Sequence, residues 1–133
     1  MKKIISIVVF LFAGIILSAQ TDSTKTVDKD STVISFAETM PEFGGRIDGF
    51  QIYVHKNLKY PATDLEGTVY VEFVVEKDGS VSGAYVRKSS GVKELDAEAL
   101  RLVSVMPAEW TPGTMNGRNV RVDVIEPIKF VLQ

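Results

Sequence analysis

The sequence contains no cysteine and only one histidine, His55, among its 133 residues. Without cysteine there is no disulfide framework, no thiolate nucleophile and no acylated lipoprotein cysteine. One histidine cannot build a two-histidine metal site, and no serine lies in a nucleophile elbow where it could form a triad with that histidine. Gly44-Gly45 is too short to cradle a phosphate. We therefore expect no enzyme activity, no cofactor, no metal site and no small-molecule substrate.

An excess of one charge is also lacking, because 15 basic and 17 acidic residues give a net charge of −2. No basic stripe that could follow a phosphate backbone is present, so nucleic acid is not expected as a partner. Glu94 and Glu98 lie four residues apart on a predicted helix. We interpret this acidic pair as solvated charge and not as the carboxylates of a glycosidase. The length predicts one domain with appendages.

The one long apolar run lies at the N-terminus, where Lys2 and Lys3 precede residues 4–17 and Ser18-Ala19-Gln20 follows. This pattern is typical of a secretory signal peptide, which we assign to residues 1–19. The alternative is a retained inner-membrane anchor, but the run of 14 residues falls short of the roughly 20 that span a bilayer. The pattern predicts export to the periplasm, without membrane attachment if the segment is cleaved.

Residues 20–38 are rich in threonine, serine, aspartate and lysine, which predicts a flexible linker. All five prolines lie at or beyond Pro41, so the linker is not a stiff polyproline spacer. We place the folded domain at residues 39–133.

Two amphipathic helices are predicted in this domain. Apolar residues at three- and four-residue steps, beginning at Ile47, predict a helix over residues 46–59 that ends at Tyr60-Pro61. The same periodicity predicts a second helix over residues 94–106, which Pro107 ends. Trp110 follows it, and we interpret its ring as part of the core, with an exposed binding aromatic as the alternative.

Three strands alternate with these helices. Residues 67–76 alternate apolar and polar side chains, Asp78-Gly79 predicts a type I′ turn, and residues 80–88 form the second strand. The apolar phase of that strand changes at Gly83, which predicts a bulge. The third strand, residues 119–133, again alternates with a period of two. Pro127 has no N–H for a ladder, so this last strand is predicted at a sheet edge or with a bulge.

The element order predicts an α+β fold with a small three-stranded antiparallel sheet and two helices. If the second helix returns the chain to the starting edge, the last strand pairs beside the first, and the order across the sheet is second, first, third. Its other side is then open. Natural proteins protect such an edge or use it to capture an extended peptide.

Several blocks in order resemble the C-terminal domain of the TonB energy-transducer family, in the form common in Bacteroidetes. They cover residues 39–133 and read PEFGG, NLKYP, EGTVYVEFVVEKDGSV, LDAEAL, MPAEWTPG and VRVDVIEPIKFVL. The resemblance implies a periplasmic α+β module that binds the TonB box, a short segment of outer-membrane TonB-dependent receptors, by adding it as a strand to the sheet edge.

The resemblance also implies where the partner binds. Residues 122–130 would pair with the docked segment, and Tyr60-Pro61 would lie near it; a helix stop with a buried ring is the equal alternative for that pair. The partner-binding residues so implied are Tyr60, Pro61, Arg121, Val122, Asp123, Val124, Ile125, Pro127 and Lys129.

The N-terminal part departs from a complete transducer, because the anchor looks cleavable and no proline-rich spacer follows it. We therefore expect a stand-alone exported form that still recognises its receptor segment. The sequence does not support a role in transmitting force from the inner membrane. The second hypothesis is a soluble structural or signalling module that forms a homodimer, or binds another periplasmic domain, through the same edge.

Overall fold

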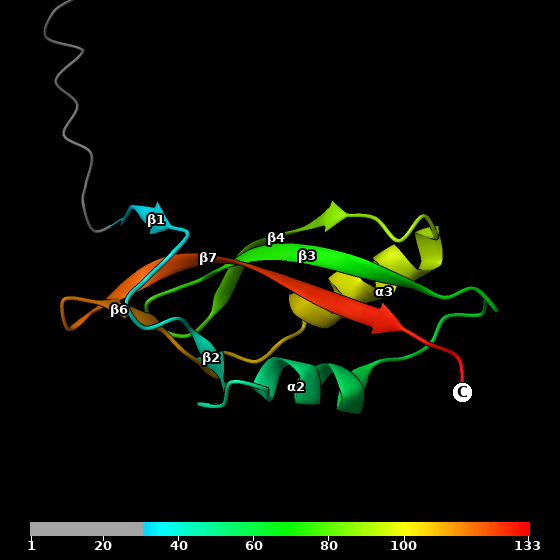
Figure 1. Cartoon of the computed structure of the whole chain (residues 1–133), viewed down its shortest axis with the longest axis horizontal. Coiled ribbons are helices and arrows are strands. Elements are labelled where there is room, and N and C mark those ends of the chain that lie inside the picture. The colour runs from blue at the N-terminus through cyan, green and yellow to red at the C-terminus, as the bar shows by residue number, and fades with distance from the viewer. Residues whose placement is uncertain (1–30) are drawn as a thin grey trace, which may run out of the picture.

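The structure, a computed structural model, describes residues 31–133, so the predicted signal peptide and most of the predicted linker lie outside the described residues. Two helices pack with a curled sheet (Figure 1). The elements in chain order are β1 (Val33–Ile34), β2 (Glu42–Phe43), α2 (Gly49–Asn57), β3 (Gly67–Val75), β4 (Val81–Lys88), α3 (Lys93–Ser104), β5 (Trp110–Thr111), β6 (Gly113–Met115) and β7 (Arg118–Phe130).

The main sheet has the order β1-β7-β3-β4, with β6 also paired to β7. β3 pairs antiparallel with β4 and with β7, the latter in an unbroken register from Gly67 opposite Phe130 to Val75 opposite Val122. The predicted order of the three long strands is confirmed. The prediction of only three strands is wrong, because β1 and β6 join this sheet and β2 and β5 form a separate ladder.

The first of these extra strands comes from the segment predicted as a linker. Val33 and Ile34 pair in parallel with Arg121 and Val122, and Ile34 packs against the core. Two apolar residues in a polar stretch carry too little periodic signal to predict a strand. A neighbouring strand edge nevertheless gives them backbone partners.

The two hairpin turns differ from each other. Only Gly79 of Asp78-Gly79 has a positive φ, of 86°, so the predicted type I′ turn is wrong there. The Asp78 carboxylate accepts a hydrogen bond from the Ser80 N–H at 3.0 Å, which holds a longer loop. Asn116-Gly117 has positive φ at both residues and fits the type I′ turn between β6 and β7.

The bulge predicted in β4 is confirmed. Gly83 has a φ of 63°, and the β3 to β4 register shifts between the Glu72 and Val74 pairs, opposite this glycine. A second shift lies between Tyr70 and Val71. Because each bulge adds local twist, β4 curves along the sheet.

The first helix is shorter than predicted. α2 starts at Gly49, and Ile47, which was expected on its apolar face, lies before the helix and is 93% exposed. A Cβ at Gly49 would lie 1.8 Å from the Phe43 carbonyl oxygen, so close packing against β2 requires glycine where the helix begins. Phe50 and Val54 are buried as the pattern predicted, and α3 buries its own apolar face.

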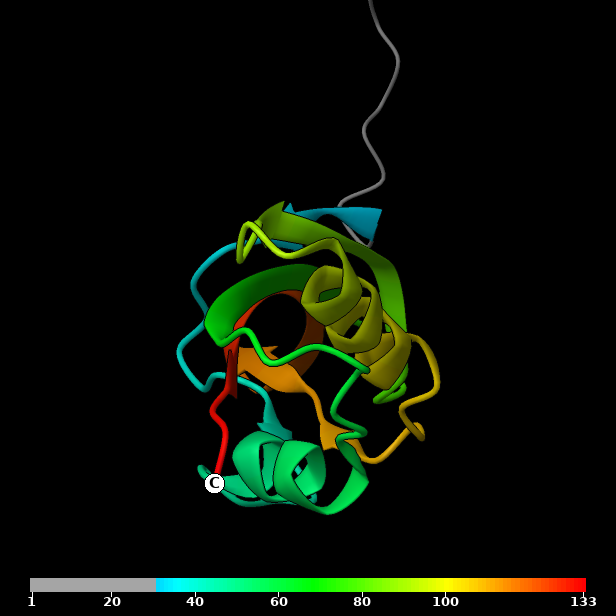
Figure 2. The same cartoon turned by 90° about the vertical axis from the view of Figure 1, so that its right-hand side faces the viewer.

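An aromatic cluster occupies the core between α2, β3 and the β2 to β5 ladder. The Trp110 ring, 6% exposed, lies with its centroid 5.5 Å from that of Phe43, 6.1 Å from Phe50 and 5.6 Å from Phe73. Trp110 is therefore a core residue, as interpreted from the sequence. Viewed from the end, α2 and α3 lie on the same concave side of the curled sheet (Figure 2).

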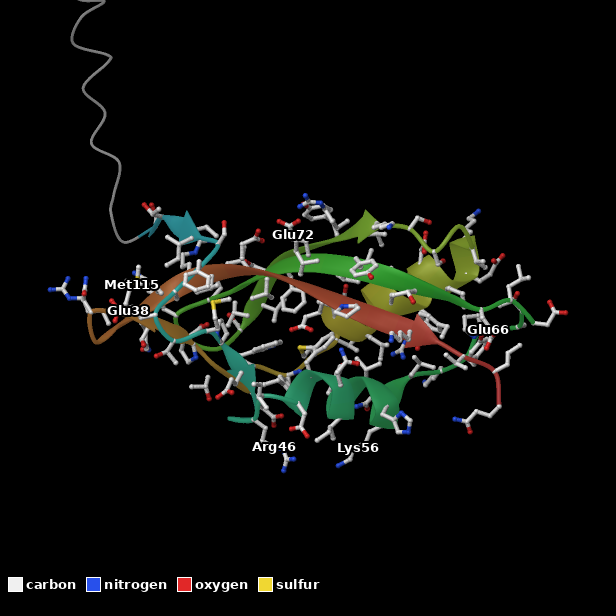
Figure 3. The ribbon with its side chains drawn as sticks, in the orientation of Figure 1. Glu38, Arg46, Lys56, Glu66, Glu72 and Met115 are labelled. Atoms are coloured by element: carbon white, nitrogen blue, oxygen red, sulfur yellow. The ribbon has the colours of Figure 1, made fainter. Side chains whose placement is uncertain are left out.

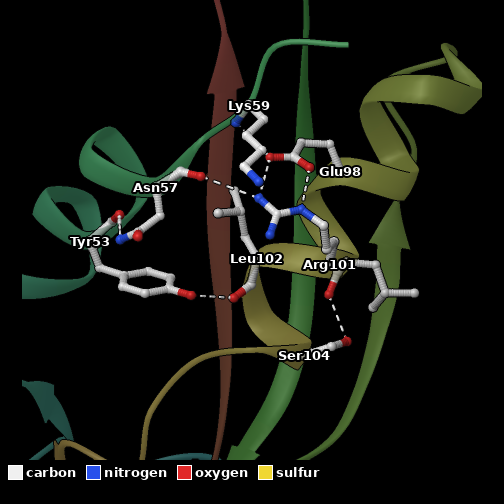
Figure 4. Close-up of polar contacts among 8 residues, drawn as sticks. Tyr53, Asn57, Lys59, Glu98, Arg101, Leu102 and Ser104 are labelled. Carbon is white, nitrogen blue, oxygen red and sulfur yellow. Dashed lines mark hydrogen bonds and ion pairs between the residues drawn. The ribbon is translucent and has the colours of Figure 1, made fainter.

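Glu98 joins the two helices through polar contacts (Figure 4). Its carboxylate accepts hydrogen bonds from the Lys59 N–H at 2.7 Å and from Arg101 Nε at 2.6 Å. Burial alone would raise the pKa of Glu98, but the Arg101 and Lys59 hydrogen bonds lower it overall. The interpretation of Glu98 as solvated charge is wrong, because the turn after α2 packs over this face of α3 and leaves Glu98 only 8% exposed.

Candidate functional site

The two sides of β7 are used differently. One side pairs with β3 from Val122 to Phe130, whereas the other pairs with β1 only at Arg121 and Val122. Within residues 31–133, no strand pairs with that second side beyond Val122. We call the second side of residues 123–130 the open edge. The expectation of an open last strand thus holds for this stretch and is wrong at Arg121 and Val122, where β1 lies.

Pro127 indicates which backbone groups face the open edge. Gln51 Nε2 of α2 donates a hydrogen bond to the Pro127 carbonyl oxygen at 3.0 Å, so this carbonyl points away from β3. Backbone groups alternate between the two sides of a strand, so Asp123, Ile125 and Lys129 face the open edge as well. The N–H that proline lacks would have pointed to the same side, so Pro127 costs the sheet no ladder hydrogen bond.

Two grooves flank the open edge. The first, of about 760 Å³, lies between residues 35–42 and residues 123–126, and we call it the strap groove. The second, of about 640 Å³, lies between α2, Tyr60 and residues 129–133, and we call it the tail groove. Gln51 lines the tail groove and bonds to Pro127 between the two. An extended chain laid along the open edge would therefore run through both grooves.

A carboxylate pair stands beside the open edge on the outer face of the sheet. Glu72, 8% exposed, accepts hydrogen bonds from the Tyr85 hydroxyl at 2.7 Å and from the Arg87 guanidinium. A hydrogen bond from Asp123, together with these two, lowers the pKa of Glu72 to about 2. Burial and the Glu72 charge raise the pKa of Asp123 to about 6. Figure 3 shows Glu72 on the side of the sheet away from α2.

The sheet's other edge, β4, is built differently. It carries two register shifts and ends in Arg87 and Lys88, both exposed. Bulges and charged side chains are devices by which proteins protect a strand edge from pairing. β7 keeps an unbroken register with β3 over the whole open edge, so it is the better template for an added strand.

A family model described as the C-terminal of the Gram-negative bacterial TonB protein matches residues 56–132, which include the open edge. This chain belongs to that family. TonB C-terminal domains interact with outer-membrane receptors, and membership supports a TonB-like role in the energy coupling of transport. The family acts in transport and protein interaction and is not a known enzyme family. It resides in the cell envelope, in the periplasm or associated with the membrane.

Two solved structures of the TonB C-terminal domain of Helicobacter pylori are similar to the chain. A solution structure of its residues 179–285 is 26% identical and covers 62% of this chain and 77% of that one, with a TM-score of 0.49. A second, of residues 194–285, is 24% identical and covers 64% and 91%, with a TM-score of 0.46. No curated protein matches the chain.

The predicted site residues on the last strand fall into three groups. Asp123, Ile125, Pro127 and Lys129 present their backbones to the open edge. The side chains of Val122 and Val124 are in the core. Arg121 is already engaged, because its guanidinium bonds to Glu76 at 2.7 Å and to the Ser31 carbonyl oxygen at 2.5 Å.

Tyr60 packs as the structural interpretation of this pair expects, and its place beside a docked segment stays a prediction. Its ring packs edge-on against Phe130 with the centroids 5.8 Å apart, and its hydroxyl donates to the Leu65 carbonyl oxygen at 2.6 Å. The same ring lines the tail groove. Pro61 is half-buried beside it. This corner therefore follows the end of α2 at Asn57 and forms a wall of the groove.

Sequence reasoning missed Gln51 and the strap-groove residues 35–42. Gln51 is an exposed polar residue in a helix, and only the fold brings its amide to Pro127. Within residues 31–133, no helix is long and apolar enough to cross a membrane, and no group of three or more histidines or acidic residues could hold a metal ion.

Proposed function

We propose that this chain docks the TonB-box segment of outer-membrane TonB-dependent receptors by adding it as a strand to the open edge, in energy-coupled transport. The observation that carries the proposal is the unpaired side of residues 123–130, whose partner strand β3 is in unbroken register. Strand addition draws its affinity from backbone hydrogen bonds and its specificity from pockets for alternate side chains.

The open edge meets both requirements. Ile125 and Lys129 supply N–H and C=O groups in the plane of the sheet, Asp123 supplies its C=O, and the Pro127 carbonyl adds an acceptor once Gln51 gives way. The strap groove and the tail groove offer space for side chains on either part of an added strand. An extended segment of about seven residues, at 3.3 Å each, matches the length from Asp123 to Lys129.

The test is a titration of the ¹⁵N-labelled full chain with a synthetic peptide that carries the TonB box of an outer-membrane receptor from the same host. We expect the amide signals of Ile125 and Lys129 to shift and their hydrogen exchange to slow. The amides of Val81 and Ser82 on β4, which line neither groove, serve as an internal control and should stay in place. Shifts confined to β4, or an open edge that stays unprotected at saturation, would overturn the proposal.

Sedimentation of the chain without peptide tests the alternative of a self-associating module. Strand addition to receptors predicts a monomer whose open edge is free. A tight dimer whose contact protects the Ile125 amide would instead favour the module that pairs with its own copy.

We also propose that residues 1–19 are a signal peptide and that the chain acts in the periplasm without an anchor. The basis is the short apolar run between Lys2-Lys3 and the small residues that precede Gln20. The N-terminal residue of the protein from its native host tests this. A mature start at Gln20 supports a stand-alone receptor-binding form, whereas an intact Met1 restores an anchored transducer.

A further inference from the structure

We propose that residues 31–37 form an intramolecular strap that occupies the end of the docking edge and competes there with an incoming partner strand. The inference builds on the proposed function, because it concerns the same side of β7. Its basis is β1, in which Val33 and Ile34 lie against Arg121 and Val122 on the side that the open edge continues.

The strap contacts β7 and the core through residues 31–34. Beyond the two-residue ladder, Arg121 donates to the Ser31 carbonyl oxygen at 2.5 Å, and Ile34 packs against the core. Val33 is 39% exposed and Phe36 is 78% exposed. Short pairings with exposed side chains open at a low free-energy cost, so this strand can leave β7 without unfolding the domain.

The strap is anchored at its C-terminal end. Ala37 is 1% exposed, and the Thr39 N–H donates to the Thr114 carbonyl oxygen of β6 at 3.2 Å. Ser35 and residues 38–42 line one wall of the strap groove, and residues 123–126 line the other. Figure 1 shows this segment running from β1 across β7 towards β2. Opening can therefore swing residues 31–36 about a fixed point near Ala37.

Geometry makes the strap and a long docked strand exclude each other. A strand added along residues 123–129 lies in line with β1 and meets it at Val122. A partner that also pairs with Arg121 and Val122 needs the backbone groups that β1 uses. β1 thus stands where the docked strand would extend, and its release lengthens the available edge.

Because the chain has no native cysteine, an engineered disulfide can hold the strap on β7 without competing thiols. Ile34 and Val122 are paired neighbours across the parallel ladder, a spacing compatible with a disulfide, so the full chain carrying Ile34→Cys and Val122→Cys can be locked by oxidation and released by reduction. The probe is the synthetic peptide that carries the TonB box of the receptor. We expect the reduced form to bind it roughly tenfold more tightly than the oxidised form, because each lost backbone pairing weakens docking. Wild type with and without reductant is the control.

The strap proposal is overturned if oxidised and reduced forms bind the peptide equally and the Val33 and Ile34 signals do not move at saturation. A second probe keeps the test independent of the receptor: a synthetic peptide of residues 30–37 of this chain, added to the Ile34→Pro variant, in which β1 lacks the N–H that faces Arg121. We expect it to shift the Arg121 and Val122 amides in this variant and to leave the oxidised double-cysteine form unchanged. Phe36→Ala, outside the ladder, should behave as wild type.

The two probes separate the two proposals. If the receptor peptide binds no form while the peptide of residues 30–37 binds Ile34→Pro, the strap stands and receptor docking fails. If the receptor peptide binds all forms alike and the strap peptide binds none, docking stands and the strap fails.

Discussion

Glu98 and Asp123 are two carboxylates largely removed from solvent, and their surroundings act on them in opposite directions. Glu98 accepts hydrogen bonds from Arg101 and from the Lys59 backbone, so its charged form is favoured. Asp123 faces the Glu72 carboxylate, so its neutral form is favoured. The folded state therefore favours a charged carboxylate at Glu98 and a neutral one at Asp123, so the two should respond to pH in opposite directions.

Replacing Glu98 should weaken the contact between the turn after α2 and α3. We expect Glu98→Ala to lower the free energy of unfolding by about 2–3 kcal/mol, because hydrogen bonds to a charged group are lost and a backbone donor is left without its acceptor. Glu94→Ala, on the exposed part of the same helix, should change it by less than about 0.5 kcal/mol. Urea unfolding followed by Trp110 fluorescence measures both. Equal effects would contradict the assigned role.

This stabilisation should also depend on pH. The folded-state pKa of Glu98 is below its unfolded value, so the contribution is present above pH 4.5 and is lost as the pH falls through the folded pKa. The difference in stability between wild type and Glu98→Ala should therefore shrink on acidification.

Asp123 gives the opposite pH dependence. Its folded pKa of about 6 is above an unfolded value near 3.9, so the native state binds more protons and stability falls as the pH rises from about 4 to 6. Asp123→Asn keeps a donor for Glu72 without a charge. We expect this variant to be more stable than wild type by about 1–2 kcal/mol at pH 8 and equally stable near pH 4.

Comparing Asp123→Ala with Asp123→Asn separates the effect of the charge from that of the hydrogen bond. Asp123→Ala removes both, so it should show a smaller gain in stability at pH 8. Chemical unfolding at several pH values measures the three proteins. A wild-type to Asp123→Asn difference that stays constant from pH 4 to 8 would contradict the pairing of Asp123 with Glu72.

At the scale of elements, the long strands could be predicted because one face of each is buried. Period-two alternation locates β3 and β7 to within a few residues, and Pro127 correctly indicates an edge position. The short strands β1, β2, β5 and β6 could not be predicted, since two or three residues carry no period and form only against a partner. The type I′ turn at Asp78-Gly79 failed because the Asp78 side chain bonds Ser80 and favours a longer loop.

The open edge of β7 yields a prediction of its own. The Ile125 N–H faces the same side as the Pro127 ring nitrogen, so Ile125→Pro should keep the β3 pairing and remove one docking hydrogen bond. We expect the free energy of unfolding to change by about 1 kcal/mol or less and the affinity for the receptor peptide to fall roughly tenfold. Ile125→Ala removes the side chain, keeps the N–H and serves as the matched control.

If Ile125→Pro unfolds the domain, the N–H faces β3 and the orientation of the edge is wrong. If the variant folds and binds like wild type, the peptide does not pair along β7. Isothermal titration with unfolding curves on the same samples distinguishes these outcomes.

For the whole molecule, the α+β class and the order of the long strands could be predicted, but not the boundary of the docking edge. That boundary is set by contacts between distant segments. Gln51 of α2 bonds to Pro127, and Val33 pairs with Arg121 across 88 positions in the chain. The sequence around Gln51 and around Val33 has no local pattern that predicts these contacts, so only the folded chain shows where the edge begins.

The aromatic cluster should carry much of the stability of the whole domain. Trp110 packs with Phe43 of β2, Phe50 of α2 and Phe73 of β3, so one ring joins the small ladder, a helix and the main sheet. Trp110→Ala should cost about 3–5 kcal/mol, a large share of the 5–15 kcal/mol typical of a domain. Trp110→Phe should cost about half as much, because most of the buried area remains. Phe36→Ala, at a 78% exposed ring, should cost less than about 0.5 kcal/mol.

Circular dichroism during urea unfolding measures all three variants without relying on tryptophan fluorescence. A Trp110→Ala variant as stable as Phe36→Ala would show that α2 and the β2 to β5 ladder are held to the sheet by other contacts.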